Sequence, residues 1–420
     1  MDNPGTAFIL RCMNDELDTD IAIVGGGLAG LSLALALSQA GPRVTVIDAQ
    51  SLPALRDNAF DGRSYALALT SVRMLRALDV WSAVEGQAQP MREIKVTDGH
   101  AGRGSAPWML HFDHAEIEEG PMGHMIEDRH LRRALLDAVA ARPGITHLPD
   151  TLVTTQATDA SGAVLTLADG RTLRCRLMIG ADGRSSGTAT RAGITRTGWD
   201  YPQTALVCAI AHEEPHGGVA HQFFMPSGPL AILPLSGNRS SIVWTERTAL
   251  AQQIDALDDA AYLQVLRPRF GDFLGEISLA GARYTYPLAL SLADSFVAKR
   301  LALVGDAAHR VHPIAGQGLN AGLRDVAALA HVVGHAARRG EDYTSAAVLQ
   351  RYQQWRQFDT AALAGATDAF NRLFSNDNPL LRLGRDMGMG LVNAVPGLRR
   401  GFMREAAGLT GDLPDLMRGA

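Results

Sequence analysis

The fold of this chain is decided by the stretch IAIVGGGLAG (residues 21–30), which continues through LSLALAL (31–37) to VTVID (44–48). The apolar, β-branched run at 21–24 predicts a buried strand, and the run at 31–37 predicts a buried helix. Strand, glycine-rich turn and helix follow one another in the order that a dinucleotide-binding site requires. The sequence therefore predicts a nucleotide-binding unit at the start of the first domain.

The spaced glycines of this turn have different expected roles. Gly25 permits a tight turn, Gly27 lets the backbone approach a pyrophosphate without an intervening Cβ atom, and Gly30 permits close packing of the helix on the strand. The phosphates would then lie at the helix N-terminus, near Leu28 and Ala29, where unpaired N–H groups and the helix dipole favour negative charge.

The second strand ends at Asp48. An acidic residue about twenty residues beyond the glycines is expected to bind a ribose hydroxyl. A glycine pattern alone is also typical of a connecting turn. The strand before it, the helix after it and the acid in place favour nucleotide binding over that interpretation.

Composition excludes several classes of protein. With 420 residues, of which 46% are hydrophobic, the chain can bury a large core and is expected to form two domains. A net charge of −5 gives no electrostatic reason to expect nucleic acid as a partner. The three cysteines, Cys12, Cys175 and Cys208, have neither metal-ligand spacing nor a disulfide framework, which favours a reducing, cytoplasmic location.

No apolar run is long enough to cross a bilayer, and the first residues carry no secretory signal. We expect residues 1–19 to be a disordered leader. Met13 precedes the first strand closely, so we interpret it as an alternative natural start to Met1.

Two further strands end in the same way as the first. The apolar run 177–180 leads to Asp182, and the run 300–304 leads to Gly305 and Asp306. Gly316 then opens a long predicted helix. Open α/β sheets bind ligands at the carboxyl ends of their strands, so these positions are candidate ligand contacts.

Between these strands the pattern changes to short strand-like runs separated by glycine-containing turns, which predicts an antiparallel sheet with a helical insertion at 249–266. The first domain is thus expected to be discontinuous. The predicted division is 20–92, 122–195 and 290–335 for the nucleotide-binding domain, 93–121 and 196–289 for the substrate domain, and 336–420 for a C-terminal helical region.

Three charged positions have alternative interpretations. Arg63 precedes a predicted helix and could neutralise a pyrophosphate, but a surface arginine is an equally good interpretation. Asp128 precedes an amphipathic run and is predicted to be its N-cap. His309 and His312 have the spacing of a metal-ligand pair, but no third ligand lies near them in the sequence, so we predict no metal site.

The C-terminal region combines apolar residues with arginines, which is typical of a helix on a membrane surface. Packing against the protein's own domain is the commoner explanation, and we favour it. Peripheral contact with the inner membrane, a complex with other proteins and a homo-oligomer stay open.

Three segments together resemble the class A flavoprotein monooxygenases: 25–30 with Asp48, the Asp182-Gly183 segment, and Gly305-Asp306 followed by 316–320. Finer details are similar to the ubiquinone-biosynthesis hydroxylases, the polyprenylphenol branch of that family. The segments that carry this similarity are 61–67, 228–235, 305–309, 312–320, and Tyr352, Arg356 and Asp359. The resemblance implies an α/β fold, with a Rossmann-like FAD-binding domain like that of para-hydroxybenzoate hydroxylase, an inserted antiparallel-sheet substrate domain and a C-terminal helical region.

The resemblance also implies FAD as the cofactor and NAD(P)H as a transient co-substrate. The cofactor-binding residues that it implies are Gly25, Gly27, Leu28, Ala29, Gly30, Asp48, Arg63, Asp128, Arg129, Asp182, Gly305, Asp306, Pro313, Gly316, Gly318, Leu319 and Asn320.

Several of these residues have specific implied roles. Asp48 would bind the adenosine ribose, although the family more often has glutamate there. Arg63 would lie over the cofactor, Asp128 or Arg129 would make a polar flavin contact, and Asp306 would bind the ribityl and pyrophosphate region. Asp182 is linked by resemblance to both FAD and NAD(P)H. The amides of 318–320, at a helix N-terminus, would stabilise the negative charge of reduced flavin.

The implied reaction is hydroxylation: NAD(P)H reduces FAD, O2 adds to give a C4a-hydroperoxide, and its distal oxygen attacks an activated phenol ring. No side-chain nucleophile is required, and we name no catalytic residue. The stretch 221–235 is mostly apolar and contains no arginine, which favours an uncharged, lipophilic phenol over a hydroxybenzoate. The resemblance implies that this phenol is polyprenylated. A flavin-dependent reductase, a monooxygenase of another small aromatic compound and an FAD-bearing assembly subunit remain alternatives.

Overall fold

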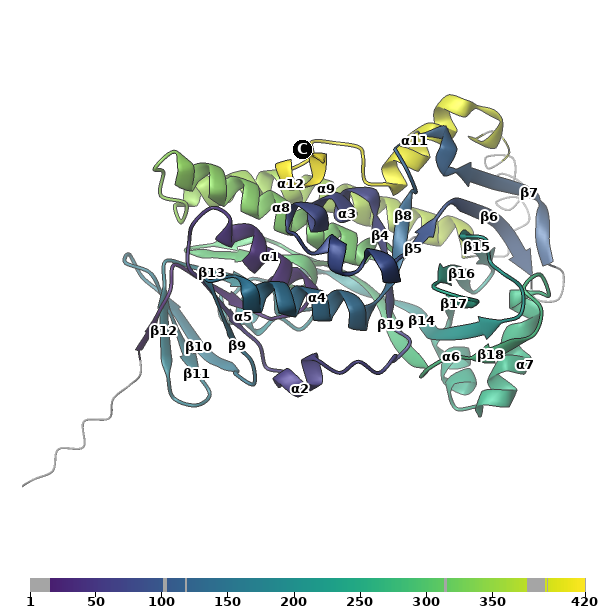
Figure 1. Ribbon diagram of the computed structural model, residues 1–420, viewed down its shortest axis with the longest axis horizontal. Coiled ribbons are helices and arrows are strands. Elements are labelled where there is room, and N and C mark those ends of the chain that lie inside the picture. The colour runs from purple at the N-terminus through teal and green to yellow at the C-terminus, as the bar shows by residue number, and fades with distance from the viewer. Residues whose placement is uncertain are drawn as a thin grey trace, which may run out of the picture.

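The computed structural model of the protein describes residues 16–100, 104–117, 119–312, 316–375, 390 and 392–419. A parallel sheet lies toward one end of the molecule and a larger, mostly antiparallel sheet toward the other, with long helices running along one side (Figure 1). The expected contact residue Pro313 lies outside the described residues.

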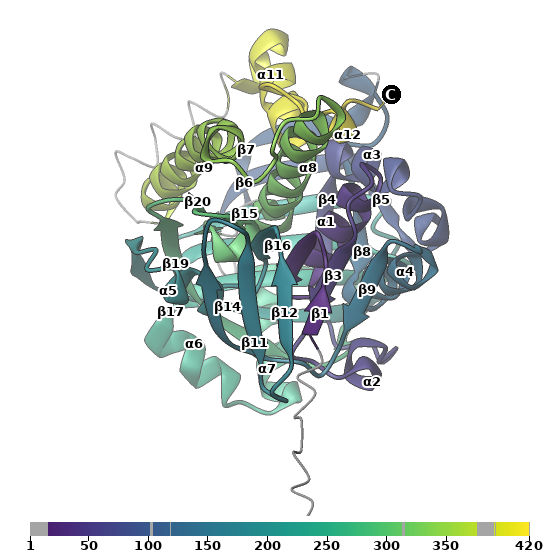
Figure 2. The ribbon, with the colours of Figure 1, turned by 90° about the vertical axis from the view of Figure 1, so that its left-hand side faces the viewer.

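The parallel sheet has the strand order β20-β21-β13-β2-β3-β9, and only the β20–β21 pair is antiparallel. Its strands are β2 (Ile21–Val24), β3 (Val44–Ile47), β9 (Ile145–Leu148), β13 (Leu177–Gly180), β20 (Val297–Ala298) and β21 (Leu301–Leu303). The central strands are buried over their whole length, as expected for a parallel sheet covered on both faces. The helices α1 (Leu28–Ser38), α4 (Asp128–Ala141) and α8 (Gln317–Arg338) pack around it (Figure 2).

The larger sheet joins distant parts of the chain. Its order is β22-β19-β14-β17-β16-β15-β6-β7, with β18 paired to β14. Its strands are β6 (Glu93–His100), β7 (Gly104–Asp113), β14 (Arg196–His212), β15 (Val219–Met225), β16 (Gly228–Leu235), β17 (Arg239–Arg247), β18 (Ile277–Leu279), β19 (Tyr284–Ala293) and β22 (His309–Arg310). The helices α6 (Thr248–Asp255) and α7 (Asp259–Phe270) cover one face, where Trp244, Tyr262 and Leu266 are buried together. The predicted antiparallel sheet and helical insertion are therefore present, while the proposed domain boundaries stay a prediction.

Two smaller sheets complete the fold. One contains β1 (Glu16–Asp18), β12 (Thr172–Cys175), β11 (Ala163–Leu167) and β10 (Val153–Thr158), and the other contains β4 (Ser64–Ala68), β8 (Gly123–Glu127) and β5 (Gln89–Met91). Because β1 pairs with β12, the leader expected at 1–19 does not extend through Glu16–Asp18, and the rest of it lies outside the described residues.

The C-terminal region is largely helical where it is described. Helix α9 (Ala346–Phe374) packs beside α8, and α12 (Asp415–Arg418) packs on α8 and on α3 (Leu69–Ala77) (Figures 1 and 2). The remaining helices are α2 (Leu52–Leu55), α5 (Gly187–Arg191), α11 (Pro396–Ala406), η1 (Trp81–Ala83), η2 (Glu85–Gln87), η3 (His114–Glu116) and η4 (Gly305–Ala307). Within the described parts of the chain, no helix combines the length and the apolar character needed to cross a bilayer.

Candidate cofactor and substrate site

The predicted contact segments meet at one edge of the parallel sheet. Val24 pairs in register with Ile47 and with Gly180, and Gly180 pairs with Leu303. These four residues end parallel strands, so the segments that follow them emerge side by side at the carboxyl edge. The structure thus brings together four parts of the chain that are far apart in sequence, at the edge where such sheets bind ligands.

The glycine turn after β2 is shaped by two close backbone approaches. Gly25 has a φ of +109°, and a Cβ atom there would lie 2.3 Å from the carbonyl oxygen of Ala181. A Cβ atom on Gly30 would lie 1.9 Å from the carbonyl oxygen of Gly25. Gly27 is different, because nothing lies within 4 Å of the position of its Cβ. The backbone is therefore open to a ligand at Gly27, as a pyrophosphate contact requires.

Two helix N-termini at this edge have no side-chain cap that would compete with a bound anion. Helix α1 begins at Leu28 and α8 at Gln317, and both have a glycine N-cap, no side-chain cap and no acidic residue in the first turn. The first N–H groups of a helix have no partner within the helix, so those of Leu28 and Ala29 can bind phosphate. Gly318 has no atom within 4 Å of its Cβ position, which leaves the start of α8 open. These features fit the phosphates and the ring of FAD.

Asp48 follows β3 and is 7% exposed. Its Oδ1 accepts a hydrogen bond from the backbone N of Gln50 at 2.9 Å. Among the described residues, nothing donates a hydrogen bond to the other oxygen, Oδ2. Oδ2 lies close to Gly26, and a Cβ atom on Gly26 would be only 2.3 Å from it. The geometry fits acceptance of a hydrogen bond from a ribose hydroxyl, despite the short side chain.

Asp306 follows β21, and its side chain is exposed to solvent. Desolvation by its surroundings raises the pKa of its carboxyl, although His309, Arg310, Arg196 and Arg184 act in the opposite direction. Arg196 is fixed nearby, because it donates to the carbonyl oxygen of Ala307 at 2.7 Å. An exposed carboxylate with cationic side chains nearby is suited to bind the hydroxyl groups of a ligand.

A buried ionic network, which the sequence analysis missed, holds the turn that presents Asp306. Asp325 of α8 is 0% exposed and accepts a hydrogen bond from the backbone N of Gly305 at 2.9 Å. Its carboxylate also contacts His309 Nε2 at 2.6 Å and Arg356 Nε at 2.7 Å. Arg356, which reaches in from α9, also contacts Asp359 at 2.9 Å.

The network fixes the charge state of Asp325. Burial alone would raise its pKa, but the charges of His309 and Arg356 and their hydrogen bonds outweigh burial and hold the pKa below its usual range. His309 thus has a carboxylate partner within a buried network. The clue in the sequence was an acidic residue inside a long apolar helix, together with Arg356, which the resemblance had already singled out.

The side chain of Asn320 ties the start of α8 to β4 and α3. Its Oδ1 accepts from the backbone N of Ala68 at 2.9 Å and from Ser71 Oγ at 2.8 Å. Its Nδ2 donates to the carbonyl oxygens of Ala66 at 2.8 Å and Gly316 at 3.1 Å. The side chain is therefore fully used within the protein, and its role is to position the N-terminus of α8.

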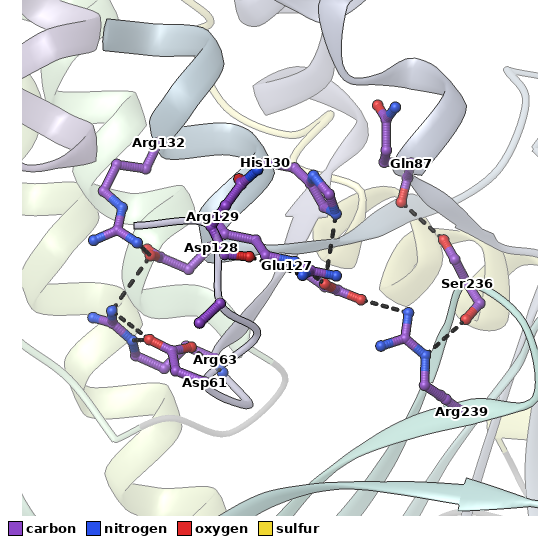
Figure 3. Close-up of polar contacts among 12 residues, drawn as sticks. Asp61, Arg63, Gln87, Glu127, Asp128, Arg129, His130, Arg132, Ser236 and Arg239 are labelled. Carbon is purple, nitrogen blue, oxygen red and sulfur yellow. Dashed lines mark hydrogen bonds and ion pairs between the residues drawn. The ribbon is translucent and has the colours of Figure 1, made fainter. Parts of the chain in front are cut away.

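Arg63 and Asp128 lie in one ion-paired cluster (Figure 3). Arg63 contacts Asp61 at 2.6 Å and Asp128 at 3.5 Å, and Arg132 contacts Asp128 at 3.1 Å. Tyr65 donates to the other oxygen of Asp128 at 2.9 Å. The prediction that Asp128 is an N-cap is wrong, because Glu127 is the N-cap of α4 and these partners engage both carboxylate oxygens of Asp128.

Arg129 belongs to a neighbouring network centred on the buried Glu127 (Figure 3). The carboxylate of Glu127 contacts Arg129 Nε at 2.7 Å and Arg239 Nη2, from β17 of the larger sheet, at 2.7 Å. The ring of Phe60 lies 5.3 Å from the guanidinium of Arg129 and 5.1 Å from that of Arg239. These contacts join the start of α4 to the larger sheet, so Arg129 has a structural role. Its expected contact with the flavin stays a prediction.

Asp182 organises the loop after β13. Its oxygens accept from Ser186 Oγ at 2.5 Å, Thr188 N at 2.9 Å and Thr188 Oγ1 at 2.8 Å. The carboxylate thereby holds the start of α5 against the strand end. Its contact with FAD or NAD(P)H stays a prediction.

One face of the larger sheet forms an apolar wall beside the N-terminus of α8. Val207, Val243 and Ala231 lie in register across β14, β17 and β16, on the face opposite α6 and α7, and all three are only half-buried. Ala66 packs with residues of this face, and a Cβ atom on Gly316 would lie 3.0 Å from the Ala66 side chain. The wall therefore adjoins the predicted flavin-binding turn.

This fold and this edge define a flavoprotein of the FAD-binding monooxygenase class. Residues 18–363 match the family described as FAD binding domain, and the chain belongs to that family, within the class A flavin monooxygenases. This confirms the predicted fold class and the predicted FAD cofactor. The protein is an FAD-dependent monooxygenase that uses NAD(P)H and O2 on a small aromatic substrate.

Two relatives and one solved structure illustrate the relationship. The chain is 45% identical over 403 residues to ubiquinone hydroxylase UbiL of Rhodospirillum rubrum, covering 95% of this chain and 92% of that protein. It is 37% identical to 3-demethoxyubiquinol 3-hydroxylase of Escherichia coli, covering 93% and 99%. The crystal structure of p-nitrophenol 4-monooxygenase PnpA from Pseudomonas putida DLL-E4 superposes with a TM-score of 0.78 at 19% identity, covering 94% and 99%, which shows the shared fold.

Proposed function

We propose that this monooxygenase hydroxylates the ring of a lipophilic, polyprenylated phenol in ubiquinone biosynthesis. The observation that carries the proposal is the half-open apolar wall of Val207, Val243 and Ala231 beside the start of α8. The three aligned residues of the wall offer no cation that could pair with a carboxylate, whereas burial of an ionised substrate would require one. Two relatives, which are named ubiquinone hydroxylase and 3-demethoxyubiquinol 3-hydroxylase and are similar over nearly the whole chain, support the same substrate class.

The residues of the chain would bind and orient the reactants. Bound FAD would supply the chemistry, accepting electrons from NAD(P)H and activating O2. The N-termini of α1 and α8 would hold its phosphates and stabilise negative charge on its reduced ring. Asp48 and Asp306 would accept hydrogen bonds from its hydroxyl groups. The apolar wall would orient the phenol and exclude water, which limits wasteful release of H2O2.

The decisive experiment supplies 18O2 to the purified holoenzyme with NAD(P)H and a short-chain prenylated phenol. We expect one labelled oxygen in the product and faster NAD(P)H oxidation when the phenol is present. A reduced but unlabelled product would support the reductase alternative. A bound flavin with no phenol-stimulated oxidation would support the assembly-subunit alternative.

The substrate class is tested separately by filling the wall. In Ala231→Leu, the added bulk should raise KM for the prenylated phenol about tenfold or more while the flavin spectrum stays unchanged. The matched control is Ala157→Leu, which makes the same change on the exposed strand β10. Equal activity of both variants, or a preference of the parent enzyme for hydroxybenzoate, would contradict the proposed substrate.

We also propose peripheral membrane contact through α11. Leu398 and Phe402 lie one turn apart on this helix and are among the exposed large apolar side chains, and Arg400, between them in the sequence, is also exposed. Arg399 and Arg404 instead pair with Glu116 and Glu119, so the helix is less basic than its sequence indicates. A Leu398→Ser, Phe402→Ser double variant should lose binding to anionic liposomes. Unchanged partition would reject this contact.

A further inference from the structure

Far from the cofactor edge, two histidines of α8 and an aspartate of α12 converge on one point. His331 Nδ1 lies 3.1 Å and His335 Nε2 lies 3.0 Å from the same oxygen, Oδ2 of Asp415. One ligand atom from each residue lies within 4.8 Å of the other two. The histidines are four residues apart, so they share one face of the helix, which is the spacing of paired histidine ligands in many zinc sites.

The distances between the imidazole nitrogens and the carboxylate oxygen fit a bound metal ion. Zinc binds imidazole nitrogen at about 2.0–2.1 Å and carboxylate oxygen at about 2.0–2.2 Å, so two ligand atoms of a tetrahedral site lie about 3.3 Å apart. The observed separations of 3.0 and 3.1 Å are close to that value. Small side-chain rotations would therefore admit an ion between the three ligand atoms.

The two rings are held in place before any ion binds. The imidazoles of His331 and His335 stack with centroids 4.1 Å apart, and the edge of Trp355 packs on His331 at 5.3 Å. His331 Nδ1 is shielded from water and faces Asp415 Oδ2 at 3.1 Å. Burial also lowers the pKa of His331, which favours the neutral imidazole that binds metals.

The nearby guanidinium of Arg418 leaves one carboxylate oxygen of Asp415 available to a metal ion. Arg418 approaches Asp415 through the other oxygen, Oδ1, at 3.7 Å, and its Nη2 lies closer to Asp412, at 3.2 Å. Oδ2 of Asp415, the oxygen that faces both imidazoles, is therefore not the one that Arg418 approaches.

We propose that His331, His335 and Asp415 bind one divalent cation of the zinc class, which joins α12 to α8. Two imidazoles and a carboxylate suit zinc and similar transition metals rather than magnesium or calcium. A water molecule would complete the coordination. The site lies 11 residues or more beyond Asn320 on α8, about 16 Å along the helix axis, so its role is structural. It would fasten the C-terminal segment, whose Met417 is already buried in the main core.

The proposal departs from our prediction of no metal site. The spacing of His331 and His335 was visible in the sequence, but their partner Asp415 lies 80 residues beyond His335. Only the packing of α12 on α8, seen in Figures 1 and 2, brings the third ligand into place.

The test titrates zinc into the full-length, FAD-loaded protein after removal of metals, in competition with a chromophoric chelator. We expect one equivalent to bind with a Kd in the micromolar range or tighter. His335→Ala and Asp415→Asn should each weaken binding at least tenfold. Both side chains are partly exposed, so these variants should retain FAD and the parent's melting temperature in the absence of metal.

The matched control is His111→Ala. His111 has nearly the same side-chain exposure as His335, 38% against 39%, and also contacts a carboxylate, Glu93 at 2.8 Å. Within the described parts of the chain, it belongs to no three-ligand group. Its substitution should leave zinc binding unchanged. The proposal is overturned if the parent binds no equivalent below about 100 μM zinc, if His335→Ala binds as tightly as the parent, or if His111→Ala weakens binding equally. Any of these would leave the cluster as an ion-paired contact between the two helices.

Discussion

Substitution of two glycines in the turn after β2 separates cofactor binding from folding. In Gly30→Ala, the new Cβ atom would lie 1.9 Å from the carbonyl oxygen of Gly25. A Cβ atom normally lies more than 3 Å from other heavy atoms, so α1 and the turn must move apart by over 1 Å. Because the clash involves backbone and not a flexible side chain, this movement is costly. Such overpacking costs about 3 kcal/mol. The variant should unfold at lower urea concentration even without FAD.

Gly27→Ala is the matched substitution at the N-cap of the same helix, three residues before Gly30. Nothing lies within 4 Å of the new Cβ, and the φ of −70° at this position suits alanine. Replacing a glycine N-cap by alanine should cost about 1 kcal/mol or less. The new methyl group would instead occupy the space expected for the pyrophosphate. We therefore expect near-normal folding of the apoprotein but at least tenfold weaker FAD binding.

Two measurements distinguish these effects. Urea unfolding of the apoproteins gives the free energy of unfolding, and quenching of flavin fluorescence during reconstitution gives the Kd for FAD. The argument predicts a large loss of stability for Gly30→Ala and a selective loss of affinity for Gly27→Ala. If Gly27→Ala binds FAD as tightly as the parent, the assignment of this turn to the pyrophosphate is refuted.

Three further predictions follow from buried groups. In Arg356→Met, Asp325 keeps its charge but loses a buried partner, so the free energy of unfolding should fall by about 3–5 kcal/mol. A loss below about 1 kcal/mol in urea titrations would contradict the network. In Asn320→Leu, several buried backbone groups lose their partners, so the affinity for FAD, measured by flavin fluorescence, should fall at least tenfold. If the variant binds FAD as tightly as the parent protein, Asn320 does not position the start of α8. Burial lowers the pKa of His124 to about 4, below that of the unfolded chain, so its contribution to stability is complete above about pH 6.5 and is lost as the pH falls toward 4. The urea midpoint should therefore drop over this interval, and His124→Gln should drop less.

The parallel sheet was predictable because local signals agreed with the tertiary fold. The run at 21–24 has β-branched residues and no polar interruption, and the helix 28–38 is buried on nearly all sides. Glycine spacing located the turn because two close backbone approaches there exclude any side chain. Such features are visible in the sequence because steric exclusion acts on each residue separately.

Side-chain partners could not be predicted in the same way. Asp128 has the sequence signature of an N-cap, but Tyr65, Arg63 and Arg132 converge on it from another strand and from the next helical turn. Asp325 is separated from Arg356 by 31 residues, and their pairing depends on how α8 and α9 pack. A local propensity of about 1 kcal/mol cannot compete with several charged partners supplied by tertiary contacts.

The helix α8 connects these findings, because two of its buried side chains, Asn320 and Asp325, hold different parts of the chain. Asn320 fixes its start to β4 and α3, and Asp325 fixes the turn after β21 and, through Arg356, the helix α9. An α-helix is stiff over this length, so a displacement at Asp325 must also displace the N-terminus of α8. Among the described residues, Arg356 makes its polar contacts with Asp325 and Asp359 and not with the glycine turn, yet its loss should weaken cofactor binding as well as folding. The long helix therefore explains how a buried charge on α9 can control the geometry of the flavin edge.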